Sequence, residues 1–183
     1  MRAGTVELFD ADTDSQPRQQ TLCEGAVVLR GFASGREREI LIALDAVIRV
    51  APLRHMRTPG GLRMSVAMGN CGELGWISDR RGYRYEHRDP QTAKPWPAMP
   101  SVFATLARDA AAHAGFDKFA PDACLINRYE AGTKLSLHQD CNECDFDQPI
   151  VSVSLGLPAT FLFGGLQRSD RHLRVPLVHG DVV

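Results

Sequence analysis

Two stretches of the chain carry apolar residues at helical spacing. In the first they recur every three or four positions, at Ile40, Leu44, Val47 and Ile48. This spacing predicts an amphipathic helix over residues 35–49, and Ser34 with Glu37 matches the capping box that begins many helices. The second stretch predicts a helix over residues 99–114, which Gly115 ends.

Short apolar segments separated by turn residues predict strands on either side of these helices. The first strand is expected at residues 25–29. The later ones are expected at residues 123–129, 134–138, 150–156, 160–163 and 175–178, with another beginning at Val182. Short strands in such a series indicate an antiparallel barrel or a double-sheet jelly roll. The pattern therefore predicts a mainly β fold of the α+β class, with its helices toward the N-terminus.

Between residues 51 and 97 the pattern is broken by prolines and by a turn at residues 58–61. Only residues 64–68 and 83–85 predict short strands there. A long, irregular segment inside a compact domain is more often functional than filler, so we predict a lid over about residues 51–97. Residues 1–20 are polar and aperiodic and predict a mobile arm, which leaves residues 21–183 as a single domain.

Composition narrows the class of protein. The 183 residues suffice for one domain, and 44% of them are hydrophobic. No apolar run is long enough to cross a membrane and the N-terminus lacks the apolar region of a signal peptide, so a cytoplasmic location is expected. Five cysteines at irregular spacing favour free thiols over a disulfide framework. Cys141 and Cys144 leave a redox or metal role open.

The net charge of −1 conceals a basic segment. Residues 51–95 contain eight Lys or Arg residues against four acids, a local excess of four positive charges. Trp76, Tyr83 and Tyr85 lie within this segment. Cations interleaved with aromatic rings suit a polyanion whose bases can stack, as in single-stranded nucleic acid. An ordinary solvated surface is the alternative interpretation of the same charges.

His138 and Asp140 are the sharpest candidates for chemistry. In a strand, residues two positions apart point to the same face, so this imidazole and carboxylate can bind one metal ion. Two histidines and one carboxylate hold iron(II) in a class of oxygenases. The pattern is weak by itself, but Asn127 and Tyr129, one hairpin upstream, offer donors for a dicarboxylate cofactor. Without the metal pair, Tyr129 would be interpreted as a core residue.

At these residues the chain resembles the AlkB family of DNA-alkylation repair dioxygenases. Two of the matching segments contain the candidates above: Asn127-Arg128-Tyr129 and Leu135-Ser136-Leu137-His138-Gln139-Asp140. The others are residues 58–61, 64–68, 75–76, 89–97, 121–126, 151–159 and 163–166. The resemblance runs from about residue 25 to residue 183, and so many matches in order are more specific than any single motif.

The resemblance implies a double-stranded β-helix with a nucleotide-recognition lid, the β-helix lying at about residues 121–183. It implies that His138 and Asp140 bind iron(II), with 2-oxoglutarate and dioxygen as co-substrates. The implied 2-oxoglutarate site consists of Asn127, Arg128, Tyr129, Leu135 and Ser152. The implied contacts with nucleic acid come from Thr58, Met68, Trp76, Tyr83, Arg84, Tyr85, Asn142 and Arg168. Among these, Trp76 would stack on the flipped base.

The implied activity is oxidative demethylation of 1-methyladenine and 3-methylcytosine, which releases formaldehyde, succinate and carbon dioxide. Single-stranded DNA is the expected substrate, with RNA or double-stranded DNA as alternatives, and the protein is expected to be a monomer. A methylated base that cannot pair is easier to flip into a site. Three other hypotheses stay open: a hydroxylase of another substrate, an inactive nucleic-acid-binding fragment, and a cupin-type isomerase or storage barrel.

The chain departs from the family's pattern at three places. The family's second iron-binding histidine, two arginines for 2-oxoglutarate and the last strands would follow residue 183, so we expect this chain to supply two of three protein ligands. Asn142 stands where some relatives have an aspartate facing the base, which weakens the expected preference for cationic bases or alters the balance between adenine and cytosine. Cys141 directly follows Asp140 and is an expected target of oxidation.

Overall fold

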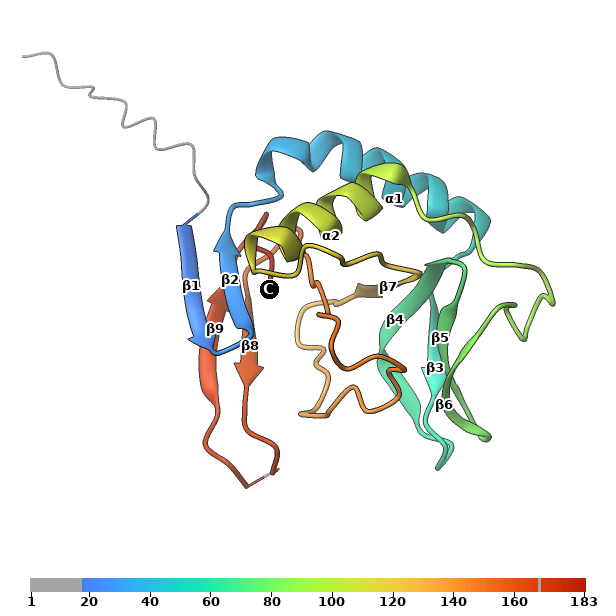
Figure 1. Ribbon diagram of the computed structural model, residues 1–183. Coiled ribbons are helices and arrows are strands. Elements are labelled where there is room, and N and C mark those ends of the chain that lie inside the picture. Colours follow the sequence, from blue (N-terminus) through green and yellow to red (C-terminus); the bar gives the residue numbers. More distant parts are fainter. Residues whose placement is uncertain (1–17, 168) are drawn as a thin grey trace, which may run out of the picture.

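The computed structural model describes residues 18–167 and 169–183. In this part of the chain the helices are α1 (Glu37–Val50) and α2 (Ser101–His113), and a short 3-10 helix, η1 (Ser34–Arg36), precedes α1. The strands, in chain order, are β1 (Arg18–Cys23), β2 (Ala26–Arg30), β3 (Arg54–Arg57), β4 (Arg63–Gly72), β5 (Gly75–Asp79), β6 (Gly82–Glu86), β7 (Ala123–Arg128), β8 (Ala159–Phe163) and β9 (Leu173–Leu177). Figure 1 shows the two helices lying together across one side of the strands. Within the described ranges, no helix is long and apolar enough to cross a membrane.

The strands form antiparallel pairs. In the described chain β1 pairs with β2, β5 with β6 and β8 with β9, while β3, β4 and β7 form a three-stranded sheet. The C-terminal residues lie beside β2, where Leu29 and Val182 exchange backbone hydrogen bonds of 2.7 and 3.0 Å. Antiparallel strands with helices across one side agree with the predicted mainly β, jelly-roll class.

A shared apolar core holds the helices on the strands. Ile40 of α1 and Leu106 of α2 are buried together with Leu29 of β2 and Val182. These are inward positions of two amphipathic helices, spaced as the sequence predicts. Burying an apolar side chain of this size stabilises a fold by about 1.5–3 kcal/mol. The cluster therefore fixes both helices to β2 and to the C-terminal segment.

Both helices match their predicted positions within two residues, but the predicted capping box is wrong. Neither η1 nor α1 has a side-chain cap, and Ser34 begins η1 instead. Ser34 packs against the turn at Gly180, where a Cβ atom would lie 2.2 Å from the Ser34 hydroxyl oxygen. Tertiary packing thus overrides the local capping signal. Glu37 and Glu39 still lie in the first turn of α1, where negative charge interacts favourably with the helix dipole.

Three strand predictions are wrong. Residues 134–138 form no strand. Residues 150–156 form no regular strand either, although Ser152 and Val183 exchange backbone hydrogen bonds and Val153 forms an isolated bridge with Val182. Val182 makes isolated bridges, to Leu29 and Val153, instead of beginning a regular strand. Pairing depends on a neighbouring backbone, which an apolar pattern does not specify. Residues 18–20 of the predicted arm belong to β1, and the rest of that arm lies outside the described residues.

The segment predicted as an irregular lid is more regular than expected. It contains β3, β4, β5 and β6, and β4 alone spans ten residues. β4 pairs with β7, so that Met68 lies opposite Asn127 and Ala67 opposite Arg128. The lid segment and the predicted β core are therefore joined through one sheet. The division into lid and core stays a prediction.

Gly72 ends β4 in a conformation that only glycine adopts easily. Its φ is +119°, and a Cβ atom would lie 2.4 Å from the carbonyl oxygen of Asp122. We expect Gly72→Ala to lower the free energy of unfolding by about 2–3 kcal/mol, measured by urea denaturation. Gly115→Ala is the matched control, because Gly115 also has a positive φ (+93°) but no atom within 4 Å of the added Cβ. Equal losses in the two variants would contradict the proposed clash.

Candidate functional site

His138 and Asp140 face each other in a loop, not on a strand as predicted. The Nε2 atom of His138 lies 3.6 Å from Oδ1 of Asp140, and both side chains are about half exposed. Nδ1 of His138 donates a hydrogen bond to the carbonyl oxygen of Ser136 over 2.7 Å. The lone pair of Nε2 is then free on the side of the carboxylate. Two electron-pair donors at this distance suit a shared cation.

This pair fits two positions of an iron(II) site. Ligand atoms about 2 Å from one metal ion lie roughly 3 Å apart, which is near the observed separation. Among the described residues, no group of three or more His, Cys, Asp or Glu side chains is placed to hold a metal ion. The structure thus brings His138 and Asp140 together, and the described chain adds no third ligand to them.

Contacts with three other parts of the molecule anchor the loop that carries this pair. Ser65 on β4 donates a hydrogen bond to the carbonyl oxygen of Lys134 (3.1 Å). Leu135 packs against a second buried cluster, beneath β4, which includes Val66 and Met68 of that strand. Gln139 donates to the carbonyl oxygen of Leu166 (2.5 Å). Tertiary contacts, not the geometry of a strand, therefore set the position of the pair.

Most residues predicted to hold 2-oxoglutarate lie beside β4. Asn127 and Arg128 end β7, and Tyr129 follows directly with its side chain half exposed. Asn127 lies opposite Met68 on β4, and Leu135 packs against the cluster that contains Met68. An exposed amide and a phenol near one another can donate hydrogen bonds to a carboxylate. Their role in binding 2-oxoglutarate stays a prediction.

The β5–β6 hairpin presents an aromatic surface. The rings of Trp76 and Tyr83 stack with centroids 5.7 Å apart and planes 15° apart. Trp76 also lies opposite Tyr85 in the register of the two strands. Tyr83 is 43% exposed, whereas Trp76 is partly buried against the cluster beneath β4. Stacked rings at the surface suit contact with a nucleic-acid base.

Arg84, predicted to contact phosphates, is held by two carboxylates of the same hairpin. Its guanidinium donates to both oxygens of Asp79 (2.9 and 3.0 Å) and to Glu86 (2.8 Å). The hydrogen bond from Arg84 lowers the pKa of Asp79 to about 2. Arg84 therefore braces the hairpin, and most of its donors are used within it.

A hydrogen bond joins this hairpin to the loop after His138 and Asp140, the candidate metal pair. The Tyr85 hydroxyl donates to Oε1 of Glu143, 58 residues further along the chain, over 2.6 Å. Burial raises the pKa of Tyr85, and so do this bond and the charges of Glu143 and Asp140. The hydroxyl therefore stays protonated and keeps donating. Sequence reasoning missed Glu143, since nothing in its local pattern indicates a distant tyrosine.

We expect Tyr85→Phe to weaken binding of a methylated oligonucleotide about fivefold to tenfold, measured by fluorescence anisotropy. A hydrogen bond to a charged group contributes about 1.5–3 kcal/mol, and this one fixes the hairpin beside the metal pair. The control is the double variant with Glu143→Ala. If the two residues act through each other, the double variant will bind the oligonucleotide no more weakly than the single variant with the lower affinity. Additive losses would contradict this coupling.

The remaining predicted site residues are dispersed. Thr58 lies in the turn before β4, and Asn142 is exposed in the loop after Asp140. Met68 is only 1% exposed, so it supports the hairpin from beneath instead of presenting a contact surface. Ser152 lies in the segment that pairs with the C-terminal residues. Arg168 lies outside the described residues.

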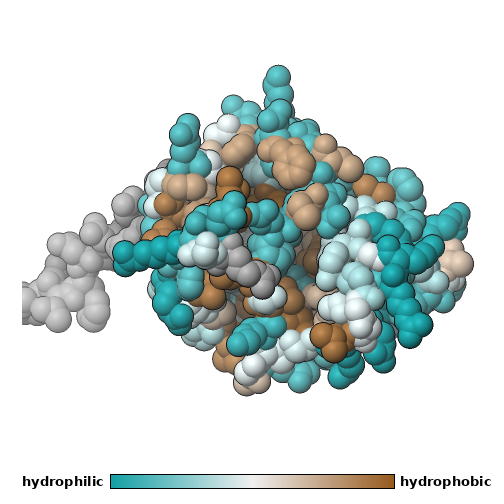
Figure 2. Space-filling view, turned by 90° about the horizontal axis from the view of Figure 1, so that it is seen from below, coloured by the Kyte–Doolittle hydropathy of each residue, from teal (hydrophilic) through white to brown (hydrophobic). Residues whose placement is uncertain are grey.

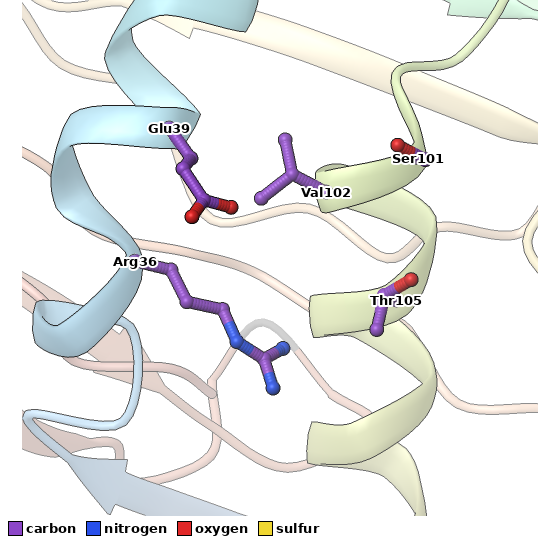
Figure 3. A pocket seen from close by; sticks show the side chains of 5 residues that line it. All are labelled: Arg36, Glu39, Ser101, Val102 and Thr105. Carbon is purple, nitrogen blue, oxygen red and sulfur yellow. The ribbon is translucent and has the colours of Figure 1, made fainter.

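A separate hollow of about 270 Å³ lies between the helices. Its lining residues are Arg36, Glu39, Ser101, Val102 and Thr105 (Figure 3). The guanidinium of Arg36 also binds Asp109 of α2 at 2.6 Å. Charges of both signs line this hollow, and none of the predicted site residues does. It is a groove between packed helices, distinct from the candidate site.

The five cysteines all lie in the described chain and are free thiols. Cys71 and Cys124 face each other across β4 and β7. The hydrogen bond with Cys124 and burial raise the pKa of Cys71, which keeps that thiol protonated. Cys141 and Cys144 are exposed on the loop after the metal pair. Exposed thiols are the ones that an oxidant reaches.

Apolar side chains emerge between polar ones on the face viewed in Figure 2. This face lies at the lower end of Figure 1, where the tips of the β5–β6 and β8–β9 hairpins are found. A surface that mixes apolar and hydrophilic groups suits a ligand that has both stackable bases and a polar backbone.

Known proteins resemble this chain in sequence and in structure. Residues 25–183 match the 2OG-Fe(II) oxygenase superfamily. The chain is 56% identical over 176 residues to "Alpha-ketoglutarate-dependent dioxygenase AlkB" of Salmonella typhimurium, which covers 96% of this chain and 82% of the relative. It is 34% identical over 113 residues to "DNA N(6)-methyladenine demethylase ALKBH1A" of Arabidopsis thaliana, with 61% and 33% covered. The solved structure of OsALKBH1 superposes with a TM-score of 0.75 at 26% identity and covers 90% of this chain and 81% of its own.

Proposed function

Because the chain belongs to the AlkB family of the 2OG-Fe(II) oxygenase superfamily, we propose that it oxidatively demethylates nucleic-acid bases. The chain is a dioxygenase, and its cofactors are iron(II), 2-oxoglutarate and dioxygen. The proposed substrates are 1-methyladenine and 3-methylcytosine in single-stranded DNA, with RNA as the alternative. The proposed products are the repaired base, formaldehyde, succinate and carbon dioxide.

The observation that carries this proposal is the hydrogen bond between Tyr85 and Glu143. It ties the hairpin with the stacked rings to the loop that follows Asp140, over 2.6 Å. Glu143 follows Asp140 by three residues, so this bond brings the hairpin to the loop that carries His138 and Asp140. A surface for bases beside a metal pair is the arrangement that oxidation of a base requires. A dioxygenase acting on small molecules has no need of such a surface.

The residues have separate roles in the proposed reaction. His138 and Asp140 would hold iron(II), while Asn127 and Tyr129 would donate hydrogen bonds to 2-oxoglutarate. When bound, iron(II) with 2-oxoglutarate and dioxygen supplies the oxidation of the methyl group. Trp76 would stack on the flipped base and keep its methyl group near the metal pair. The chain's own contribution is therefore position and charge.

The charges around Tyr85 favour a cationic base. Methylation at N1 of adenine or N3 of cytosine makes the base positively charged and unable to pair. The carboxylates of Glu143, Asp140 and Asp122 all act on Tyr85 at the edge of the hairpin. Nearby negative charge and an aromatic face both attract a cation. Asn142, in the same loop, adds hydrogen bonds without adding a charge.

The test is formaldehyde release from a single-stranded oligonucleotide containing one 3-methylcytosine. The full-length protein is incubated with iron(II) and 2-oxoglutarate, and the unmethylated oligonucleotide serves as the control. We expect formaldehyde from the methylated strand only, and loss of that signal in Trp76→Ala. Succinate formation that neither strand stimulates would overturn the proposal in favour of another substrate. Binding without any formaldehyde would overturn it in favour of a binding module.

A further inference from the structure

Asn70 holds the backbone of Trp76 with both ends of its side-chain amide. Its Oδ1 accepts the Trp76 N–H at 3.0 Å, and its Nδ2 donates to the Trp76 carbonyl oxygen at 2.9 Å. The Asn70 side chain is only 1% exposed. A buried amide whose donor and acceptor are both used is costly to replace, because each lost partner leaves a buried polar group unsatisfied.

The sheet explains why a side chain is needed at this place. Val66, Met68 and Asn70 alternate along β4 and so point to one face, which the β5–β6 hairpin covers. In the described chain β4 pairs through its backbone with β3 and β7, and β5 pairs with β6 alone. The Asn70 amide therefore makes the two hydrogen bonds with Trp76 that a neighbouring strand would otherwise make. Its donor and acceptor resemble the N–H and C=O of a peptide group.

The chain between the two residues leaves Trp76 little freedom. Five residues separate Asn70 from Trp76, and Gly72 and Gly75 are among them. A Cβ atom at Gly75 would lie 2.3 Å from the ring of Trp96. The backbone of Trp76 is thus confined by a tight turn before it and by the Asn70 amide across from it. Together they hold the Trp76 backbone from which the ring reaches to stack on Tyr83.

We propose that Asn70 is a positioning residue that orients Trp76 for stacking on the target base. This inference rests on the proposed function and adds a residue that touches neither the metal pair nor the base. Stacking on an aromatic side chain contributes about 1–3 kcal/mol per base, and it depends on the ring plane. Losing the Asn70 amide therefore lowers affinity for the flipped, methylated base. Contacts with the phosphate backbone remain, so affinity for an unmethylated strand stays the same.

Ser78, on β5 like Trp76, provides a matched control. Its side chain is buried (6% exposed), and its hydroxyl donates to the carbonyl oxygen of Arg57 on β3 at 2.7 Å. Ser78→Ala therefore also removes a buried bond between the hairpin and the sheet. It leaves the peptide group of Trp76 bound to Asn70. A general loosening of the hairpin would affect both variants alike, whereas positioning of Trp76 affects only Asn70 variants.

The experiment measures binding without turnover, in the absence of oxygen. Anisotropy gives the Kd for a single-stranded oligonucleotide with one 3-methylcytosine and for the same strand unmethylated. Trp76 emission is followed as well, with Trp76→Ala supplying the background from Trp96. We expect Asn70→Leu, which keeps the volume of the side chain, to weaken methylated-strand binding about tenfold. We also expect Asn70→Leu to abolish the quenching of Trp76 emission that accompanies binding of the methylated strand. The Kd for the unmethylated strand should stay within twofold of wild type.

Each other outcome has a defined meaning. The positioning role is overturned if Asn70→Leu keeps the preference for the methylated strand or loses affinity for both strands alike. It is also overturned if Ser78→Ala loses as much affinity for the methylated strand as Asn70→Leu does. If Asn70→Leu does not fold, Asn70→Asp replaces it, because it keeps the shape and the acceptor but loses the donor. The same loss of preference is expected from that variant. A wild-type protein with no preference for the methylated strand overturns the proposed function, and the positioning role with it.

Discussion

Replacing Asp140 by asparagine is expected to lower iron-dependent turnover by about 100-fold or more. Oδ1 of Asp140 faces Nε2 of His138 at 3.6 Å, and the described chain places no third His, Cys, Asp or Glu with them. Asp140 is the negatively charged member of this pair, so asparagine removes the charge that the pair contributes to holding iron(II). Changes at supporting residues alone typically cost 10–100-fold in metal affinity, so the loss of a direct ligand should exceed that range.

The measurement is formaldehyde release as a function of iron(II) concentration, together with the Kd for the methylated oligonucleotide. Asp145→Asn is the matched control, since Asp145 is an exposed carboxylate in the same loop whose oxygen accepts the N–H of Asp147. It should retain wild-type turnover. Asp145→Asn should also bind the methylated oligonucleotide as the wild type does, because the hairpin with Trp76 and the carboxylates near Tyr85 are unchanged. Full turnover in Asp140→Asn would show that this carboxylate is not an iron ligand.

Asp181→Ala is expected to lower the free energy of unfolding by about 3–5 kcal/mol. The carboxylate is 1% exposed and accepts hydrogen bonds from the backbone N–H groups of Gly31 (2.9 Å) and Val178 (3.0 Å). It also binds the guanidinium of Arg30 at 2.7 Å. Alanine would leave all three donors without this partner. Asp109→Ala is the control, because its ion pair with Arg36 is partly exposed on both sides and should contribute about 1 kcal/mol or less.

The Asp181 interaction also predicts how stability depends on pH. Burial by itself would raise the pKa of Asp181, but hydrogen bonds from Val178, Gly31 and Arg30 outweigh it and lower the pKa. The folded protein thus releases this proton more readily than the unfolded chain, whose aspartates titrate near about 3.9. The stabilisation is complete above that pH and disappears as pH falls through the lower folded pKa.

Chemical denaturation between pH 7 and pH 3 measures this contribution. The difference in unfolding free energy between wild type and Asp181→Ala should be constant at neutral pH and shrink below about pH 4. A difference that does not change with pH would mean that the ionised form of the Asp181 carboxylate is not the stabilising species.

The sequence predicted best those elements whose signal is local. Ile40 and Val47 recur at helical spacing and are buried in α1, and the predicted helix matches within two residues. Turn residues separated most of the short strands correctly, and the family resemblance identified the fold and the cofactors. Periodicity works here because a helix satisfies its own backbone hydrogen bonds and needs only one apolar face.

Predictions failed where a distant part of the chain decides the outcome. The residues around His138 have the alternation of a strand, but side chains hold them in place instead of a neighbouring strand. Ser65 donates a hydrogen bond to the carbonyl oxygen of Lys134, and Gln139 donates one to that of Leu166. Ser34 matches a capping box but packs against Gly180, far along the chain. In both cases a contact between residues remote in sequence outweighs a weak local preference.

By itself, the sequence determined which residues are available for chemistry: His138, Asp140 and Trp76, within a mainly β fold that resembles known iron dioxygenases. Only the tertiary structure decided how these residues meet. It placed Nε2 of His138 beside Asp140 in a loop, joined Tyr85 to Glu143 across 58 residues, and set the Asn70 amide against the backbone of Trp76. Residue types and local periodicity are properties of short segments. A hydrogen bond between distant segments exists only once the folded chain has brought its two partners together.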